Sequence, residues 1–301
     1  MLLSDVEKLV LCCFGVAVQR LFCDPCQGFS AVLGDVARCR MLRPTLWQTL
    51  ALIPSPPDSL FDPSACLAGT RLLDLDDSKL RIQAMRITQL ASTDVHKATL
   101  VHDYIKALPF GCIALNGHQG AAVVLKSQRG DCHTKGTLFV ALLRSSGIPA
   151  RLRFVSLQGA FLRGIVDLGS TNITHAIGEA YLNERWVQAD SYVVDDALEA
   201  GALQRLKQEG RVLGYGIHAQ GRRYWSGLDD AHSQYAFEDP SSMPLIDFGV
   251  AHDPECFYAN QPSLLDRSSW VTRAKWTIAA SLINRRTAQL RNENTADGVL
   301  A

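Results

Sequence analysis

Cys132 is the residue of this sequence best placed to act as a nucleophile. Thiol catalysis needs a cysteine that ionises, a base beside it and a group that orients the base. With Asp131 as N-cap, Cys132 opens a predicted helix, where unpaired N–H groups and the helix dipole favour a thiolate. The charge of Asp131 opposes this, so we expect a histidine partner and a pKa below the ordinary value of about 8.5. Taken alone, a cysteine is more commonly a small buried hydrophobe.

Two further residues, His175 and Asp190, can complete a triad if a predicted hairpin has the right register. His175 lies in an apolar strand ending near Leu182, and Asp190 ends the next strand. A two-residue loop, Asn183-Glu184, makes the two side chains diagonal neighbours on one face, within hydrogen-bond reach. A three-residue loop puts them on opposite faces. Individually, His175 fits a buried core histidine and Asp190 a turn-forming residue at a strand end.

Other polar residues are weaker candidates. Gln128 can join the Cys132 N–H in donating to an oxyanion, although an exposed loop glutamine is the commoner interpretation. Lys135, one helical turn after Cys132, is a candidate modulator of the thiolate, and His133 points elsewhere. We expect His102 at the surface of an amphipathic helix. Cysteines and histidines show no complete metal-ligand spacing, and Cys23–Cys26 is half of a zinc motif at most.

Three separated blocks of this sequence resemble the transglutaminase-like superfamily, in its bacterial-type form. The first runs from Gly130-Asp-Cys-His-Thr-Lys-Gly136 through Ser145-Ser-Gly-Ile-Pro-Ala-Arg151. The second joins His175 to Glu179-Ala-Tyr-Leu-Asn183, and the third is Trp186-Val-Gln-Ala-Asp190. The blocks occur in the family's order and cover about a third of the chain, from Thr93 to Asp195.

The resemblance implies a catalytic role for each residue and a fold for the core. Cys132 is then the nucleophile, His175 the general base and acid, and Asp190 the orienting carboxylate. The fold is α+β: a papain-like core with the nucleophile helix packed on an antiparallel sheet, plus helical N- and C-terminal extensions. Ile177 stands where the family commonly has an aromatic, and Ser191-Tyr192 replaces a usual Pro/Ser-Thr pair, so the acyl or amine pocket is expected to differ.

The pattern of the chain predicts three stretches. Residues 1–91 form a helical extension with a Pro-rich arm, and 263–301 form a helix over Ser268 to Leu290 with a frayed tail. Residues 92–262 form the catalytic core with long covering loops. The core is expected to hold a helix capped by Ser92 or Thr93 and the helix after Cys132. Its predicted strands are Arg151 to Leu157 and the hairpin strands Thr174–Leu182 and Trp186–Val194, followed by a helix over residues 197–209.

Composition excludes several classes of protein. The 301 residues carry 30 Lys+Arg and 30 Asp+Glu, and this zero formal net charge disfavours binding mainly through nucleic-acid phosphates. A hydrophobic share of 47% argues against disorder, and no apolar run is long enough to cross a membrane. Nine scattered cysteines fit reduced thiols and a cytoplasmic location. No phosphate-binding glycine loop or calcium loop is present, so we expect neither a cofactor nor a metal.

These observations predict a thiol-dependent acyl-transfer enzyme. Cys132 attacks an amide, ester or thioester carbonyl, and the resulting thioester passes its acyl group to an amine or to water. The flanking segment 210–262 is rich in aromatic residues and is expected to cover the site, which favours a small-molecule or carrier-delivered acyl substrate. The alternatives are a cysteine protease or amidase acting on peptides, and a non-catalytic interaction module that retains the triad.

Overall fold

The computed structural model describes residues 62–113, 119–259 and 270–297. Two sequence-based expectations lie wholly or mainly outside these ranges: the Cys23–Cys26 motif, and most of the N-terminal helical extension with its Pro-rich arm. The helical elements are η3 (Pro63–Leu67), α3 (Ser78–Thr88), α4 (Asp94–Ala107), α5 (Ala121–Ser127), α6 (Cys132–Ser145), η4 (Gly159–Leu162), α7 (Asp196–Gln208), α8 (Pro254–Ala259) and α10 (Trp270–Asp297). The strands are β1 (Ala150–Gln158), β2 (Asn172–Leu182), β3 (Arg185–Ala189), β4 (Leu213–Gly214), β5 (Ile217–His218) and β6 (Ile246–Ala251).

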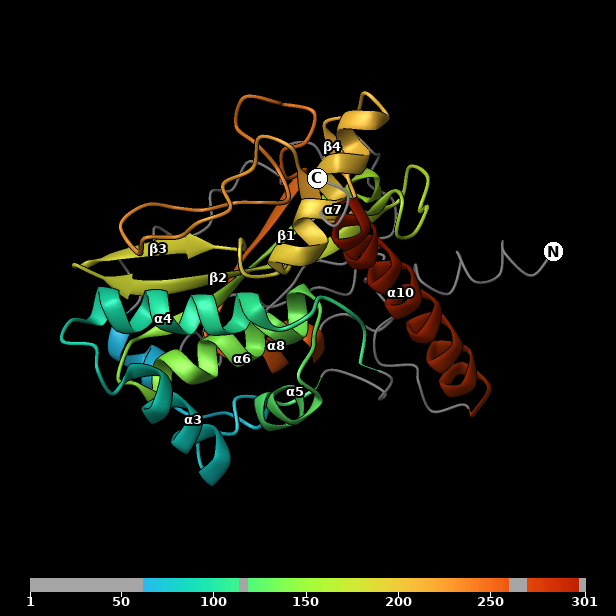
Figure 1. Ribbon diagram of the computed structural model, residues 1–301. Helices are drawn as coiled ribbons and strands as arrows, with labels where there is room; N and C mark the ends of the chain where they lie inside the picture. Colours follow the sequence, from blue (N-terminus) through green and yellow to red (C-terminus); the bar gives the residue numbers. More distant parts are fainter. Residues whose placement is uncertain (1–61, 114–118, 260–269, 298–301) are drawn as a thin grey trace, which may run out of the picture. The chain divides into compact units, whose positions relative to one another are not determined.

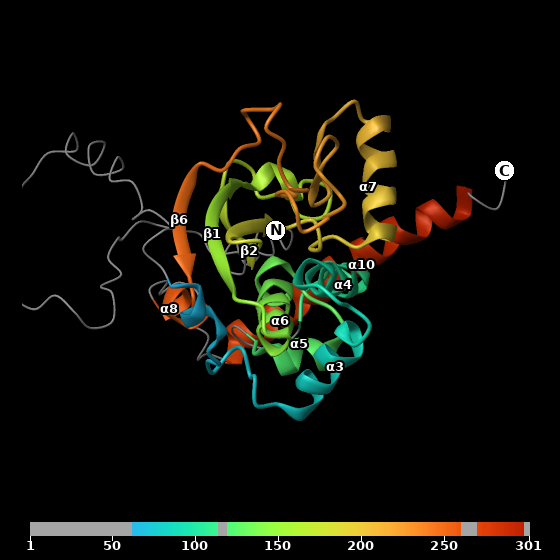
Figure 2. The ribbon, with the colours of Figure 1, turned by 90° about the vertical axis from the view of Figure 1, so that its left-hand side faces the viewer.

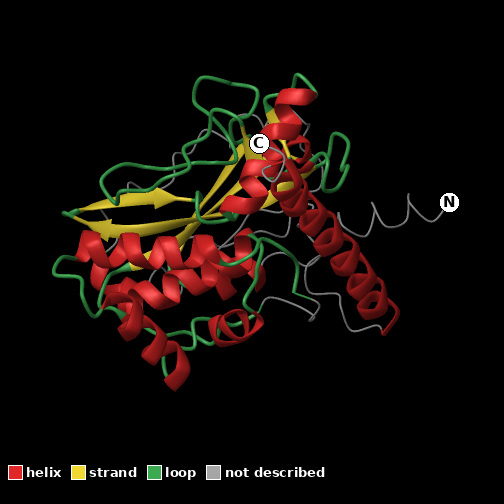
Figure 3. Cartoon of the chain, viewed as in Figure 1, coloured by secondary structure: helices red, strands yellow, loops and turns green. Residues whose placement is uncertain are grey.

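The central layer is an antiparallel sheet with the strand order β3-β2-β1-β6 among the described residues. Helix α6 packs on β2 and β1, and α3, α4 and α5 pack around α6 (Figure 1). Part of the loops that follow α7 lies on the other side of β2 and β3 (Figure 3), and part reaches the helices, where Trp225 packs beside His102 of α4. This is the expected α+β core, with the nucleophile helix packed on an antiparallel sheet.

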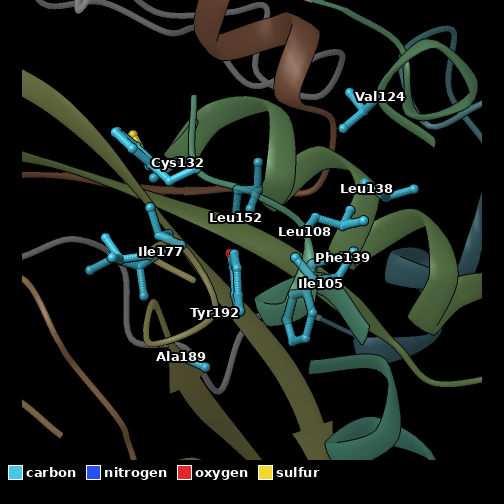
Figure 4. Packing of buried hydrophobic residues seen from close by; sticks show 14 of the residues in the cluster. Ile105, Leu108, Val124, Cys132, Leu138, Phe139, Leu152, Ile177, Ala189 and Tyr192 are labelled. Atoms are coloured by element: carbon cyan, nitrogen blue, oxygen red, sulfur yellow. The ribbon is translucent and has the colours of Figure 1, made fainter. Parts of the chain in front are cut away.

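Local sequence signals account for the helices that frame the site. Thr93 caps α4 through a hydrogen bond from the His96 N–H, as expected. Asp131 caps α6 in a capping box with Thr134, and the helix stops before Gly147, whose φ of +81° suits glycine. Within α6 nearly every side chain is buried, because the helix is surrounded by the sheet and by other helices. Figure 4 shows part of this hydrophobic cluster, with Cys132 among its labelled residues.

The hairpin between β2 and β3 has the two-residue loop. Leu182 pairs with Arg185, and Asn183 and Glu184 both have positive φ values, 49° and 62°. Such a turn matches the twist of antiparallel strands. The first of the two registers considered from the sequence is therefore the correct one.

The second hairpin strand is shorter than expected. β3 ends at Ala189 instead of continuing to Val194. The N–H groups of Asp190 and Ser191 both donate to the carbonyl of Ala231, and Val193 N–H returns to the Asp190 carbonyl. The backbone thus turns away from β2 at the position where the sequence places the carboxylate.

The described part of the segment 210–262, residues 210–259, contains more regular structure than the loops that the sequence predicts. It contains β4, β5, α8 and above all β6, which extends the main sheet beside β1 (Figure 2). The β1–β6 register shifts between Phe154 and Val155. β6 is an edge strand with a register shift and partly exposed residues. It therefore lacks the regular alternation of apolar and polar residues by which a strand is predicted from sequence.

The C-terminal helix also differs from expectation. It runs from Trp270 to Asp297, so much of the predicted tail is helical. The apolar side chains of Ile278 and Leu282 are exposed. The buried positions are Ala279, Ala280, Ile283, Thr287 and Leu290. α10 packs closely on α7, where a Cβ on Gly201 would lie 2.2 Å from the Leu290 carbonyl oxygen. The packing face therefore combines the small residues Ala279 and Ala280 with the larger Ile283 and Leu290. None of the described helices is long and apolar enough to cross a membrane.

Candidate active site

Cys132 is the first residue of α6, and its thiol lies against β2. Its side chain is buried, with 4% of the residue exposed. The sulfur accepts hydrogen bonds from the backbone N–H groups of His133, its helix neighbour, and Ala176 on β2. β3 pairs with β2 only from Gly178 onward, so Ala176 lies beyond the end of that ladder. The nucleophile candidate therefore sits beside the strand that carries His175.

The electrostatic expectation for this thiol is wrong for the resting structure. Burial raises the pKa of Cys132, and the carboxylate of Asp131 raises it further. The two backbone hydrogen bonds lower the pKa but do not overcome burial. The sequence indicates the helix terminus but not the extent of burial, which the packing of β2 decides. A thiolate here needs a nearby group that takes up the proton.

His175 and Asp190 meet as the two-residue hairpin requires. His175 Nε2 lies 3.0 Å from Asp190 Oδ2, and both residues are completely buried. A carboxylate accepts hydrogen bonds, so Nε2 carries the proton in the neutral ring. Nδ1 of His175 is buried without a hydrogen-bond partner among the described residues. The nitrogen that can accept a proton is therefore on the residue next to Ala176, which contacts the Cys132 sulfur.

Asp190 is held from several sides. Ser233 N–H donates to Asp190 Oδ1 at 2.6 Å, and His232 Nδ1 lies 3.8 Å from Oδ2. Burial acts to raise the pKa of Asp190, but its contacts with His175 and His232 lower the pKa below the usual range. Asp190 is thus a carboxylate in the folded protein. His232 was not indicated by the sequence, because it lies in a loop with no informative spacing to the other residues.

Two buried lysines fix the turn that follows Asp190. Lys135 Nζ donates to the carbonyls of Leu108 and Val193, both at 2.8 Å. Lys106 Nζ donates to the carbonyls of Ser191 and Val194 and pairs with Glu199. Burial lowers the pKa of Lys135 well below its ordinary value. Lys135 therefore supports the Asp190 turn instead of modulating the thiolate as the sequence suggested.

The side-chain amide of Gln128 is engaged by neighbouring groups. It ends α5 with a φ of 50°, and its amide donates to the Leu125 carbonyl at 2.6 Å and to Tyr104 Oη at 3.4 Å. With both amide hydrogens engaged, the side chain has none left for a substrate in this arrangement. The exposed-loop interpretation is the one that fits.

Other histidines have structural surroundings. His102, expected at the surface, is 1% exposed: its Nε2 lies 2.8 Å from Ser191 Oγ and its ring lies beside Trp225. His133 places its ring nitrogens near the Thr174 carbonyl and the Tyr258 hydroxyl, both at 3.1 Å. No group of three metal-ligating side chains was found in the part of the chain that the structure describes.

Comparison with known proteins agrees with this geometry. Residues 82–191, which include Cys132, His175 and Asp190, match the family model of the transglutaminase-like superfamily. The chain contains a transglutaminase-like domain. The match begins within α3 and ends just after the carboxylate, so the regions on either side of it lie outside the family model.

Two solved structures are similar over part of the chain. A candidate cysteine protease from Cytophaga hutchinsonii is 23% identical, with a TM-score of 0.35, and the match covers 44% of each chain. A candidate protease from Parabacteroides distasonis is 17% identical, with a TM-score of 0.29, over 42% of this chain and 26% of that one. The match thus spans less than half of either protein. No curated protein matches the chain.

Proposed function

We propose that this transglutaminase-like domain is a thiol enzyme that transfers acyl groups through a Cys132 thioester. One observation carries the proposal: His175 binds Asp190 through Nε2 and keeps Nδ1 unpaired, while the adjacent Ala176 contacts the Cys132 sulfur. A base oriented by a carboxylate next to a thiol at a helix N-terminus is the arrangement that thiol catalysis needs.

In the first half-reaction the Cys132 proton moves to His175 Nδ1. The thiolate then attacks the carbonyl carbon of an amide, ester or thioester, and the carbonyl electron pair moves to oxygen. The Cys132 N–H at the open end of α6 supplies one hydrogen bond to this oxyanion. When the intermediate collapses, the C–S bond remains, the bond to the leaving group breaks, and imidazolium His175 protonates that group.

In the second half-reaction an acceptor discharges the thioester. An amine or water gives a proton to His175 as it attacks the acyl carbon. The C–S bond breaks, and the Cys132 sulfur leaves as a thiolate that recovers the proton from His175. An amine yields a new amide, and water yields a carboxylic acid. The same three residues serve both outcomes, so the acceptor is decided by access and binding.

The enclosure of the site favours a small or carrier-delivered acyl group. His175 and Asp190 are fully buried and Cys132 is almost so. Ser233 and His232, from the segment expected to cover the site, contact Asp190, and Tyr258 from the same segment lies beside His133. A folded protein substrate would need this cover to move, and exclusion of water helps an amine to compete for the thioester.

The test is covalent trapping followed by intact-mass analysis. The protein is incubated with a panel of acyl thioesters, esters and amides, and the mass gain is assigned to a residue by peptide mapping. We expect an acyl adduct on Cys132 that is absent in Cys132→Ala and retained in Cys256→Ala, the matched control that removes a partly exposed cysteine. The proposal would be rejected if no acyl donor in the panel gave an adduct on Cys132, so that wild type and Cys132→Ala showed the same masses.

A second comparison separates the substrate classes. Acyl donors of small size are assayed beside a folded protein, each with and without an added amine. We expect turnover of the small donors and faster discharge with amine. Efficient cleavage or crosslinking of the folded protein would instead support a general protease or protein crosslinker.

A further inference from the structure

A second histidine faces the orienting carboxylate. His232 Nδ1 lies 3.8 Å from Asp190 Oδ2, the same oxygen that contacts His175 Nε2 at 3.0 Å. Asp190 therefore lies between two imidazoles. Nothing in the sequence spacing links His232 to the other two residues, and only the return of the chain after α7 brings it there.

The backbone holds His232 in this place. Ala231 accepts from the N–H groups of Asp190 and Ser191, and Ser233 N–H donates to Asp190 Oδ1 at 2.6 Å. The loop is thus attached to Asp190 on both sides of His232. The imidazole itself stacks on Tyr235, with ring centroids 4.6 Å apart and planes 21° apart.

The Nδ1 atom of His232 has no other use in the described structure. It is buried without a hydrogen-bond partner among the described residues, and the side chain is only 4% exposed. At 3.8 Å it is just beyond hydrogen-bond distance from the carboxylate, so a small movement of the ring closes the contact. A protonated Nδ1 facing a carboxylate is attractive, whereas a lone pair there would be repulsive.

We infer that His232 is a positioning residue that shares the Asp190 carboxylate with His175 and thereby sets the acid limit of Cys132 reactivity. The inference rests on the proposed function, because it concerns the same proton transfer. When His232 gains a proton, its charge is drawn to Asp190 Oδ2. The carboxylate then stabilises imidazolium His175 less, and the thiolate–imidazolium pair is lost.

Other charged and titratable groups surround this pair and must stay constant in the test. Those with electrostatic contact to Asp190 or Tyr235 are Cys132, Tyr192, Asp230, Arg153 and Asp247. None of them is altered by a substitution at position 232. A change in the pH profile of a His232 variant therefore reports on His232 itself.

The experiment follows alkylation of Cys132 by iodoacetamide against pH, with the modified cysteine assigned by mass spectrometry. His232→Phe keeps an aromatic ring on Tyr235 but removes the donor, and His232→Asn keeps an uncharged donor near the Nδ1 position. We expect the acid midpoint to fall by about half a pH unit or more in His232→Phe. We expect a smaller fall in His232→Asn, because its side chain can still donate to the Asp190 carboxylate.

His218→Asn is the matched control. His218 is a buried histidine of the same region that pairs with Asp239 at 3.1 Å, and its variant should keep the wild-type midpoint. Thermal melting of each variant checks its fold. A uniform loss of rate with an unmoved midpoint in both His232 variants would mean a merely structural role and would overturn the inference.

The inference and the proposed function fail in different ways. If the thiol–imidazole pair exists, His175→Ala must remove the alkylation of Cys132 at low pH and leave only the alkylation of an unassisted thiol at high pH. An unchanged profile in His175→Ala rejects the proposed function. A changed profile in His175→Ala together with wild-type profiles in His232→Phe and His232→Asn rejects the role of His232 alone.

Discussion

Ionisation of the thiol at Cys132 depends on partners more than on its place in the helix. Burial and Asp131 raise its pKa, and only proton transfer to an imidazole can offset the burial of a charged sulfur. His175 can accept that proton because Asp190 holds its other nitrogen. The three side chains are therefore expected to act as one unit in which removal of any member disables the others.

The substitutions at these residues should differ in a defined order. Cys132→Ala removes the nucleophile and should abolish turnover, and His175→Ala should cost nearly as much, because the two share one proton. Asp190→Asn keeps a side chain of the same size but presents the wrong partner to Nε2, and should lower kcat about 10²- to 10⁴-fold. The measurement is kcat and KM with the acyl donor found by trapping. Retained activity in both Cys132→Ala and Cys132→Ser would show that the nucleophile is another residue.

The β2–β3 hairpin decides whether the triad can assemble. Its two-residue loop places His175 and Asp190 on one face, and the departure of the chain after Ala189 brings the carboxylate to the ring. A shift of one residue would move every side chain of β3 to the opposite face. The length of this loop should therefore affect catalysis, even though the loop does not contact the thiol.

Two changes in this hairpin test that dependence. Insertion of one glycine between Asn183 and Glu184 should abolish Cys132 acylation by moving Asp190 off the His175 face. Glu184→Gly relieves a positive φ without changing loop length, and should stabilise the protein by about 0.5–1 kcal/mol with activity retained. Urea unfolding and the trapping assay supply the readouts. Arg185→Gly, in β3 itself, is the control and should destabilise, since glycine weakens a strand. Full activity in the insertion variant would contradict the register argument.

At the scale of the whole molecule, the C-terminal helix is tied to the same turn that carries the carboxylate. Arg291 on α10 pairs with Asp195 through two contacts, at 2.6 and 2.9 Å, and donates to the Phe110 carbonyl. Asp195 also caps α7 and accepts from the Phe110 N–H. In the segment that follows Asp190, the lysines of α4 and α6 thus hold the backbone carbonyls, and Arg291 of α10 holds the side chain of Asp195.

Arg291→Gln should lower the free energy of unfolding by about 2 kcal/mol at pH 7, the scale of a charged hydrogen bond with little solvent exposure. Burial acts to raise the pKa of Asp195, but Arg291 and two backbone N–H groups lower it. Because the pKa of Asp195 is lower in the folded protein than in the unfolded chain, where it is about 3.9, the ionised carboxylate stabilises the fold at pH values above that of the unfolded chain. That stabilisation disappears as the pH falls through the pKa of the folded protein. The difference in the free energy of unfolding between wild type and Arg291→Gln, measured by urea unfolding, should therefore be smaller at pH 3 than at pH 7.

Arg205→Gln is the control for this prediction. Arg205 pairs with Glu293 on the same helix α10, but both side chains are 42% exposed, so its loss should matter far less. If Arg205→Gln and Arg291→Gln destabilised the protein equally, the less exposed Arg291–Asp195 pair would contribute no more than an exposed ion pair, which would contradict the prediction.

The sequence by itself determined the candidate triad and the local elements of the site. Asp131 marks the helix that Cys132 begins, Asn183-Glu184 allows the hairpin register that joins His175 to Asp190, and the three blocks identify the family. These signals are local, because capping, turn geometry and strand alternation depend on residues a few positions apart.

Tertiary structure alone decided the surroundings of that site. It brought His232 to Asp190, turned Lys135 toward the Val193 carbonyl, and buried the thiol so that its pKa rises instead of falling. It also buried Ala279, Ala280 and Ile283 of α10 and left Ile278 exposed. Each of these depends on which segments meet after folding, and burial and long-range contact leave no periodic trace in a single sequence.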